Sequence, residues 1–240
     1  MGLGRRFALD LAAEGATVVG VARGAEALAA LELAGGGFTR SLDVSDETAV
    51  WNLVEEIVER AGRLDILINN AGIEERAPVG DLTPAAVRRT MDVNLYGVVN
   101  CTLAALPHMR AHGEGWIVNV SSGVARSPLP RQAAYSASKA AIVAFSEAIS
   151  YELEPSIKVK VLSPGFVATT RMAQGSVEHG FKVPPKMVHR TEEQVSRALL
   201  RGLDGKSFEI NCARAETLAP VARALVPSFF RRNVLKAAGR

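Results

Sequence analysis

The sequence predicts one α/β domain in which short strands alternate with longer amphipathic helices. Residues 16–21, 64–68 and 157–162 are short apolar runs rich in β-branched residues, and helical spacing follows each of them. Such alternation is typical of a parallel sheet covered by helices. The chain has 240 residues, enough for one substantial core, and its composition indicates no linker. We therefore expect residues 1–240 to form a single domain.

Composition excludes several kinds of protein. No apolar run is long enough to span a bilayer and the N-terminus has no apolar signal core, so we expect a cytoplasmic location. Cys101 and Cys212 lack the spacing of metal ligands, which argues against a disulfide framework and a zinc site. His108 and His112 lie four residues apart without a third ligand nearby, so we predict no metal site.

The positive charge is concentrated at the C-terminus. The net charge is +3, and five cations with no acid follow Pro220. A basic tail over residues 215–240 can face water, anionic lipid or nucleic acid, and we favour a solvated helix over any partner. Phe229 and Phe230 beside Arg231 leave peripheral membrane contact open, whereas we expect no nucleic-acid partner.

The N-terminal segment, residues 2–12, has helical periodicity. Leu3, Phe7 and Leu11 fall on one face, and Gly2 and Gly4 stand at the start. Glycines there let a phosphate group approach the helix N-terminus, where free N–H groups and the helix dipole favour an anion.

The strand at 16–21 ends at Ala22 and Arg23. A carboxylate at such a tip would bind the ribose 2′-hydroxyl of NAD, whereas an arginine neutralises the 2′-phosphate of NADP. No acid stands at the tip, so Arg23 favours NADP over NAD. The alternative is a surface arginine that opens a helix at 26–33.

Two further strands end in polar residues. Residues 38–42 are predicted to form a strand that ends at Asp43 and Val44, and a helix begins at Ser45 and runs to about residue 60. Asp43 could contact a bound cofactor, or it could instead cap the turn or the helix that follows. The buried strand 64–68 is closed by an Asn-Asn-Ala-Gly sequence, residues 69–72.

A long helix is predicted from Thr83 and Pro84 to about residue 109, with Pro107 bending its end. Asn94 lies inside it. An amide within an apolar helix is costly unless it finds partners, so Asn94 either serves the active site or is satisfied within the core.

The next strand and helix carry the most specific pattern. Residues 115–122 form a strand that ends at Ser122, and a helix over 132–152 carries Tyr135 and Lys139. A spacing of four stacks two side chains on one helix face. An ammonium there lowers the pKa of a phenol from its usual value of about 10, so that the phenol can exchange protons. Ser122 could then hold a substrate oxygen.

After the strand at 157–162, glycine and proline interrupt residues 171–190, where the family resemblance described below implies a mobile substrate lid. Apolar residues there predict a hydrophobic substrate. They are Met172, Val177, Phe181, Val183 and Met187. A helix over 191–203, an edge strand over 207–211 and a helical tail broken at Pro227 complete the chain.

Six motifs follow one another along the chain. They are, in order, the Gly-Leu-Gly segment at 2–4, Asn-Asn-Ala-Gly at 69–72, Asn94, Ser122, the Tyr135/Lys139 pair and the Pro-Gly segment at 164–169. Together they resemble the short-chain dehydrogenase/reductase family as far as about residue 170. The resemblance implies a Rossmann-like, doubly wound, mostly parallel sheet and an oxidoreductase that interconverts a carbonyl and a secondary alcohol. It implies the homodimer or homotetramer typical of the family, built on the two long helices.

The resemblance also assigns roles. Tyr135 is the proton donor and acceptor, Lys139 lowers its pKa and binds the nicotinamide ribose, Ser122 polarises the substrate oxygen, and Asn94 supports a proton relay. The implied cofactor-binding residues are Gly2, Leu3, Gly4, Arg23, Asp43, Val44, Asn69, Asn70, Ala71, Gly72, Tyr135, Lys139, Pro164, Gly165, Val167 and Thr169. Of these, Asp43 would meet the adenine, and Val167 and Thr169 would hold the nicotinamide carboxamide.

One departure from the family concerns the first strand. The family's phosphate loop follows a central strand, but only its last two glycines are present here, as Gly2 and Gly4. We therefore expect a gap between the strands at 16–21 and 64–68, and we expect the working protein to start upstream of Met1. A short chain with an impaired cofactor site is the rival. It would be a cofactor-binding or regulatory protein, and a membrane-peripheral module that uses the basic tail is a further alternative.

Overall fold

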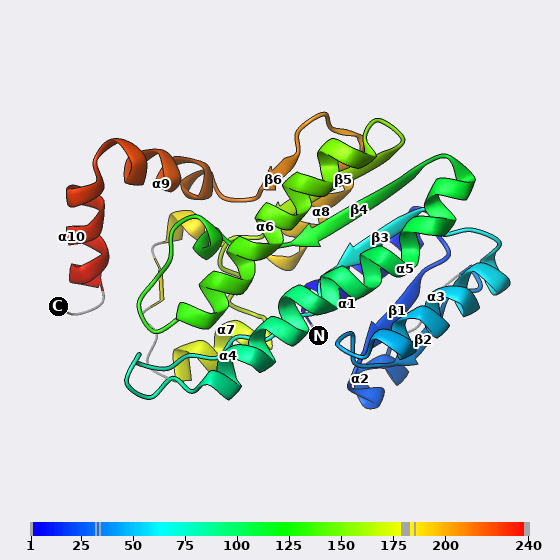
Figure 1. Ribbon diagram of the computed structural model, residues 1–240, viewed down its shortest axis with the longest axis horizontal. Helices are drawn as coiled ribbons and strands as arrows, with labels where there is room; N and C mark the ends of the chain where they lie inside the picture. The colour runs from blue at the N-terminus through cyan, green and yellow to red at the C-terminus, as the bar shows by residue number, and fades with distance from the viewer. Residues whose placement is uncertain (1, 32, 34, 179–182, 185, 238–240) are drawn as a thin grey trace.

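The structure is a computed structural model of the chain, and it describes every residue except 1, 32, 34, 179–182, 185 and 238–240. Parallel strands flanked by helices make up the described part (Figure 1). The predicted α/β, Rossmann-like class is therefore confirmed, and most predicted elements lie within a few residues of their expected positions.

The N-terminal region contains two strands and three helices. In order these are α1 (Leu3–Ala13), β1 (Val19–Ala22), α2 (Ala25–Ala29), β2 (Phe38–Ser41) and α3 (Glu47–Ala61). β1 and β2 are parallel, with Val19 opposite Phe38. α2 ends four residues earlier than predicted, because Ala30 leaves the helical conformation. α3 begins after Asp46 rather than Ser45, because the Asp46 carboxylate accepts a hydrogen bond from the Ala49 amide at 3.0 Å.

Four strands form the second sheet. They are β3 (Ile66–Asn69), β4 (Gly115–Val120), β5 (Ile157–Ser163) and β6 (Glu209–Asn211), parallel and in that spatial order. Ile117, Val118 and Val159 are fully buried in its centre. The helices α6 (Ala133–Leu153) and α8 (Glu192–Asp204) pack beside this sheet, and Thr191 begins α8 through a capping box with Gln194.

The predicted gap between the strands now seen as β1 and β3 is present. Among the described residues, β1 pairs with β2 alone and β3 pairs with β4 alone, so two sheets stand where the family has one. Val19, Val21, Ile66 and Ile68 line a cavity between them. The order β2-β1, gap, β3-β4-β5-β6 is that of a doubly wound sheet without its central first strand. That the working protein starts upstream of Met1 stays a prediction.

The predicted long helix is divided into three parts. α4 (Pro84–Met91) and α5 (Gly97–His112) are separated by a π-helical turn (Asp92–Tyr96), and Pro107 lies inside α5 without ending it. Asn94 lies in this turn and is fully buried. Single π-turns occur often at functional sites because the extra residue redirects the side chains around it.

The C-terminal part contains the remaining helices. These are α7 (Arg171–Glu178), α9 (Arg214–Leu225) and α10 (Pro227–Ala237), with short 3-10 turns at Gly123–Ala125 and Lys186–Val188. The predicted break at Pro227 separates α9 from α10, which extend away from the sheets (Figure 1). Leu225 and Phe229 are more than half exposed there. None of the described helices combines the length and apolarity needed to cross a bilayer.

Candidate active site

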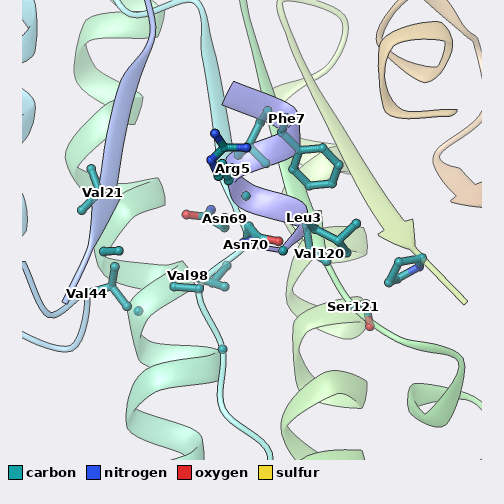
Figure 2. Close-up of a pocket in the computed structure, with 18 of the residues that line it drawn as sticks. Leu3, Arg5, Phe7, Val21, Val44, Asn69, Asn70, Val98, Val120 and Ser121 are labelled. Atoms are coloured by element: carbon teal, nitrogen blue, oxygen red, sulfur yellow. The ribbon is translucent and has the colours of Figure 1, made fainter. Parts of the chain in front are cut away.

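One cavity of about 1250 Å³ contains most of the predicted site. It follows the carboxyl ends of β3, β4 and β5 and extends into the space between β1 and β3. Figure 2 shows part of its wall, with side chains from α1, β1 and α5 and from the ends of β3 and β4. Its volume exceeds the 300–1000 Å³ usual for a ligand site because the space between the two sheets adds to it.

The phosphate end of the cavity lies at α1. No side chain caps this helix and its first turn has no acid, so its N-terminal amides remain available to an anion. Gly2 has φ 93°, and a Cβ on Gly4 would lie 2.8 Å from Asn70 Nδ2, so only glycines allow this close approach. These residues fit a dinucleotide phosphate. Arg5, which the sequence reasoning missed, also lines the cavity (Figure 2).

The adenosine end contains Arg23 and Asp43. The Arg23 side chain is 61% exposed, and its Nη1 lies 3.6 Å from Asp43 Oδ2. Asp43 accepts hydrogen bonds from the amide and hydroxyl of Ser45, which hold the pKa of the Asp43 carboxyl below its usual value. Asp43 thus caps the turn at Ser45, which was the structural alternative predicted for it. It also lines the cavity, together with Val44. Its contact with adenine stays a prediction.

The amides after β3 have different roles. Asn69 Nδ2 donates to Asn119 Oδ1 at 2.8 Å, and Asn119 Nδ2 donates to Ser146 Oγ at 2.8 Å. This buried ladder connects β3, β4 and α6. Asn69 therefore lines the cavity but uses its amide in the scaffold, whereas Asn70 lies against Gly4 at the phosphate end (Figure 2).

Asn94 supports the site from behind the cavity wall. Its Oδ1 accepts from the Ile73 amide at 2.8 Å, and its Nδ2 donates to the Ile73 carbonyl at 2.9 Å and to Ser138 Oγ at 2.9 Å. A Cβ on Gly72 would lie 3.3 Å from Asn94 Oδ1 and 3.5 Å from Lys139 Nζ. Asn94 and Lys139 therefore converge on Gly72, and the core-bonded alternative for the amide is also observed. The proton relay stays a prediction.

The three remaining catalytic candidates meet at the end of β4. Tyr135 is 7% exposed, and the Ser122 hydroxyl lies close enough to lower the pKa of its phenol. Lys139 Nζ lies 5.7 Å from the centre of the Tyr135 ring and donates to the Val120 carbonyl at 2.8 Å. The spacing of four on α6 therefore brings the phenol and the ammonium to one face, beside a serine from a different element.

Burial dominates the acid–base properties of this group. It raises the pKa of Tyr135, with a further increase from Glu74, while the Ser122 hydrogen bond and Arg76 act in the opposite direction. Burial lowers the pKa of Lys139 to about 8. The expectation that Lys139 lowers the pKa of Tyr135 is thus not met without cofactor, because both groups lose their hydration together.

The nicotinamide end is formed by the segment after β5. Pro164, Gly165 and Val167 line the cavity, and a Cβ on Gly165, which has φ 77°, would lie 2.8 Å from the Val188 carbonyl oxygen. Thr169 does not line the cavity. Its Oγ1 is turned outward to Glu192 Oε1 at 2.9 Å, and the next residue, Thr170, lines the cavity instead.

The substrate end is mainly apolar. Of the five predicted pocket residues, Met172 lines it, Phe181 lies outside the described residues, and the other three, Val177, Val183 and Met187, are at least 41% exposed and do not line it. Residues that the sequence reasoning missed complete the wall. They are Leu129, Ala173, Pro184, Val188, Ala219 and Phe230 on the apolar side and Glu74, Arg76 and Gln132 on the polar side.

No group of side chains suited to a metal ion occurs among the described residues. Cys101 and Cys212 are free thiols, and burial raises the pKa of Cys101 to about 11. The Tyr135 hydroxyl and the Lys139 ammonium are groups able to exchange protons in this cavity.

A protein-family model described as short chain dehydrogenase matches residues 1–179. The chain is 35% identical to the bovine dehydrogenase/reductase SDR family member 7B, covering 96% of the chain and 76% of the relative. It is 37% identical to the Xenopus laevis protein of the same name, of which it spans 60%. It is also 38% identical to an NADPH-dependent pterin aldehyde reductase from Arabidopsis thaliana, covering 70% of the chain and 72% of that protein.

Solved structures agree with these matches. A short-chain dehydrogenase from Burkholderia cenocepacia in complex with NADP superposes with a TM-score of 0.80 at 28% identity, covering 98% of this chain and 93% of that one. A gluconate 5-dehydrogenase from the same organism, in complex with NADP and tartrate, has a TM-score of 0.75 at 28% identity and covers 82% of each chain.

Proposed function

Because the chain belongs to the short-chain dehydrogenase family, we propose that it is an NADPH-dependent oxidoreductase that interconverts a carbonyl and a secondary alcohol on a mainly hydrophobic small molecule. The observation that carries the proposal is the meeting of Ser122, Tyr135 and Lys139 in a cavity whose other end is the uncapped N-terminus of α1. One arrangement thereby offers an anion site and a proton donor.

Each side chain has a separate task. The Tyr135 hydroxyl gives its proton to the substrate oxygen in reduction and takes it back in oxidation, while Ser122 Oγ donates a hydrogen bond to the same oxygen. The phenol carries this proton at neutral pH, as an ordinary tyrosine does. When bound, the nicotinamide supplies or accepts the hydride at its C4 atom. Lys139, whose ammonium donates to the Val120 carbonyl, would bind the nicotinamide ribose.

The test is NADPH consumption with a panel of aliphatic, cyclic and aromatic ketones and aldehydes. Tyr135→Phe removes one hydroxyl and should lower kcat/KM by about 10³-fold, within the usual range for a positioned acid. The thermal stabilisation by NADPH should remain, because a ligand that binds the folded state still raises its melting temperature. Unchanged turnover in Tyr135→Phe would refute this assignment of the acid.

Preference for NADP over NAD is part of the proposal and rests on Arg23. Its side chain is exposed at the tip of β1, and Asp43, the acid it faces, is already bonded to Ser45. Thermal-shift titrations with NADPH and NADH should therefore give a larger shift with NADPH, and Arg23→Ala should reduce the shift with NADPH alone. Equal shifts in the wild-type chain would count against this role.

The split sheet favours one second candidate, a regulatory protein that binds the cofactor without turnover. The wall of the adenosine end comes from β1 and the residues after β2, and among the described residues neither strand pairs with the sheet that carries the catalytic residues. NADPH stabilisation without reduction of any carbonyl in the panel would support this candidate over the enzyme.

We also propose a homo-oligomer, formed through α5 and α6. Their exposed side includes Leu103 on α5 and Tyr151 on α6, which are 49% and 78% exposed. Light scattering during size-exclusion chromatography would distinguish a dimer or tetramer from a monomer, and Tyr151→Glu should shift the oligomer toward the monomer.

A further inference from the structure

A small polar cluster interrupts the apolar wall of the substrate end. Arg76 Nη2 lies 2.7 Å from Glu74 Oε1, and the two side chains are only 11% and 6% exposed. The Gln132 amide nitrogen donates to the same Glu74 oxygen. All three residues line the cavity that contains Tyr135. An ion pair buried to this degree carries a large desolvation cost, so its presence in a substrate cavity requires an explanation.

The cluster is fixed beside the catalytic phenol. Gln132 immediately precedes α6, three residues before Tyr135, and the Ala77 amide donates to the Arg131 carbonyl at 3.1 Å. These contacts attach the segment after Gly72 to the start of α6. Glu74 and Arg76 have opposite effects on the pKa of Tyr135, as expected for a carboxylate and a guanidinium that both lie close to the phenol.

The chemistry of the pair matches a neutral hydroxyl group. An ionised carboxylate only accepts hydrogen bonds and a guanidinium only donates them, whereas a hydroxyl does both. A charged substrate group would be repelled by one member of the pair. Gln132 adds a second acceptor, because Glu74 orients the amide nitrogen and Gln132 Oε1 has no hydrogen-bond partner among the described residues. The cluster therefore favours a group that can donate a hydrogen bond as well as accept one.

We propose that Glu74 and Arg76 recognise a hydroxyl group close to the reacting carbonyl, so that the preferred substrate is a hydroxy ketone whose remaining surface is apolar. This inference rests on the proposed oxidoreductase function and adds the substrate class. The hydroxyl donates to Glu74 and accepts from Arg76, while Leu129 and Val188 provide the apolar contacts. A ketone without the hydroxyl makes neither of these hydrogen bonds, and a site built to hydrogen-bond a substrate hydroxyl rejects the analogue that lacks it.

The experiment compares cyclohexanone with 2-hydroxycyclohexanone under NADPH. The wild-type chain should reduce the hydroxy ketone with a kcat/KM at least about tenfold higher, a modest fraction of what a lost hydroxyl contact can cost. The double variant Glu74→Gln/Arg76→Met removes both charges together and leaves no lone buried ion. Its preference should fall to about one, because the charged pair that binds the hydroxyl is gone.

A matched control uses the neighbouring surface pair. Arg89 Nε lies 2.5 Å from Glu75 Oε1, and neither residue lines the cavity. Glu75→Gln/Arg89→Met removes the same charges beside the cluster and should keep the full preference for the hydroxy ketone. Loss of the preference in this control would assign the effect to general electrostatics and overturn the proposal.

Failure of this inference can be told apart from failure of the proposed function. Reduction of both ketones at equal rates, or an unchanged preference in Glu74→Gln/Arg76→Met, would overturn the hydroxyl site and leave the oxidoreductase intact. Reduction of neither ketone would be followed by calorimetric titration of the NADP-bound chain with 1,2-cyclohexanediol. Binding that the double variant loses would support the hydroxyl site without turnover, and equal or absent binding in both chains would overturn it.

Discussion

The β1–β2 pair and the four-stranded sheet differ in how completely they are built. β4 and β5 have partners on both edges, and all but two of their residues are buried, whereas no residue of β1 or β2 reaches full burial. The catalytic candidates lie on or beside the four-stranded sheet, hereafter the complete sheet. The adenosine end of the cavity depends on the two-stranded sheet. Positioning of the chemistry is thus secured by packing, while cofactor affinity depends on the region with fewer stabilising contacts.

The largest expected effect concerns local opening of the two sheets. An isolated two-stranded sheet is marginally stable, so the amides of β1 and β2 should exchange with solvent about a hundredfold faster than those of β4 and β5. Native-state hydrogen exchange followed by mass spectrometry would measure this ratio. Saturating NADPH should slow exchange in β1 and β2 much more than in β4 and β5, because only the first pair gains contacts that it lacks.

Equal protection of both sheets without cofactor would contradict this comparison. It would show that contacts between α5 and the end of β2 hold the two-stranded pair as firmly as strand pairing would. The helix α3, which packs against α5, provides an internal reference for this region.

Lys139 lies in the better-packed region, but burial of its ammonium should lower the stability of the chain by an amount that depends on pH. Its folded-state pKa of about 8 lies below the usual 10.5, so the unfolded chain binds its proton more tightly. Stability therefore rises with pH between about 8 and 10.5 because of this group. Lys139→Met removes that slope. Relative to the wild type, its free energy of unfolding should fall by about 2 kcal/mol between pH 8 and pH 9.5 in urea unfolding.

Lys160 provides the control. It is 3% exposed, and burial lowers its pKa too, but its ammonium donates to the carbonyls of Gly205 and Ser207 at 2.7 and 2.8 Å. Lys160→Met leaves two buried carbonyls without donors and should destabilise the chain by about 1–3 kcal/mol at neutral pH. If the stability of Lys139→Met relative to the wild type does not change between pH 8 and pH 9.5, the penalty assigned to Lys139 is wrong.

The order of elements and the meeting of Ser122, Tyr135 and Lys139 could be predicted because their signals are local. Strand runs, caps and the Tyr135/Lys139 spacing depend on residues within one or two helical turns of each other. The gap beside β1 was also predictable, since the sheet order fixes which strand is absent. The apolar character of the substrate end followed from composition, although most of the residues chosen from the lid do not line it.

Features that depend on tertiary contacts could not be predicted. The π-turn at Asn94 arises from contacts with Ile73 and Ser138, which lie far away in the sequence. Thr169 faces Glu192 rather than the cavity for the same reason. The raised pKa of Tyr135 follows from burial, which a four-residue spacing does not reveal. Nothing in the sequence distinguishes the Glu74–Arg76 pair from ordinary surface charge, because its burial depends on tertiary contacts.

The smallest expected effect comes from replacing glycine by alanine at two positions, one in contact with each region. Gly202 in α8 and Gly97 in α5 are both helical, so alanine brings each the same gain in helix propensity, about 1 kcal/mol. A Cβ on Gly202 would collide with the side chain of Ile210 in β6, coming within 2.7 Å of its Cγ1. A Cβ on Gly97 would collide with Val44, just after β2, at 2.5 Å from its Cγ2.

Ile210 is 8% exposed and belongs to the core of the complete sheet, so it has little room to move. Overpacking there should outweigh the helix gain and lower the free energy of unfolding of Gly202→Ala by about 1–2 kcal/mol. Val44 belongs to the less restrained region and can shift outward, so Gly97→Ala should lose less than about 0.5 kcal/mol. Because the shift displaces a cavity residue, Gly97→Ala should instead weaken NADPH binding, by about threefold, which corresponds to 0.7 kcal/mol. Equal destabilisation of both variants, with unchanged NADPH affinity, would mean that the end of β2 is as rigid as β6 and that the two sheets behave as one unit.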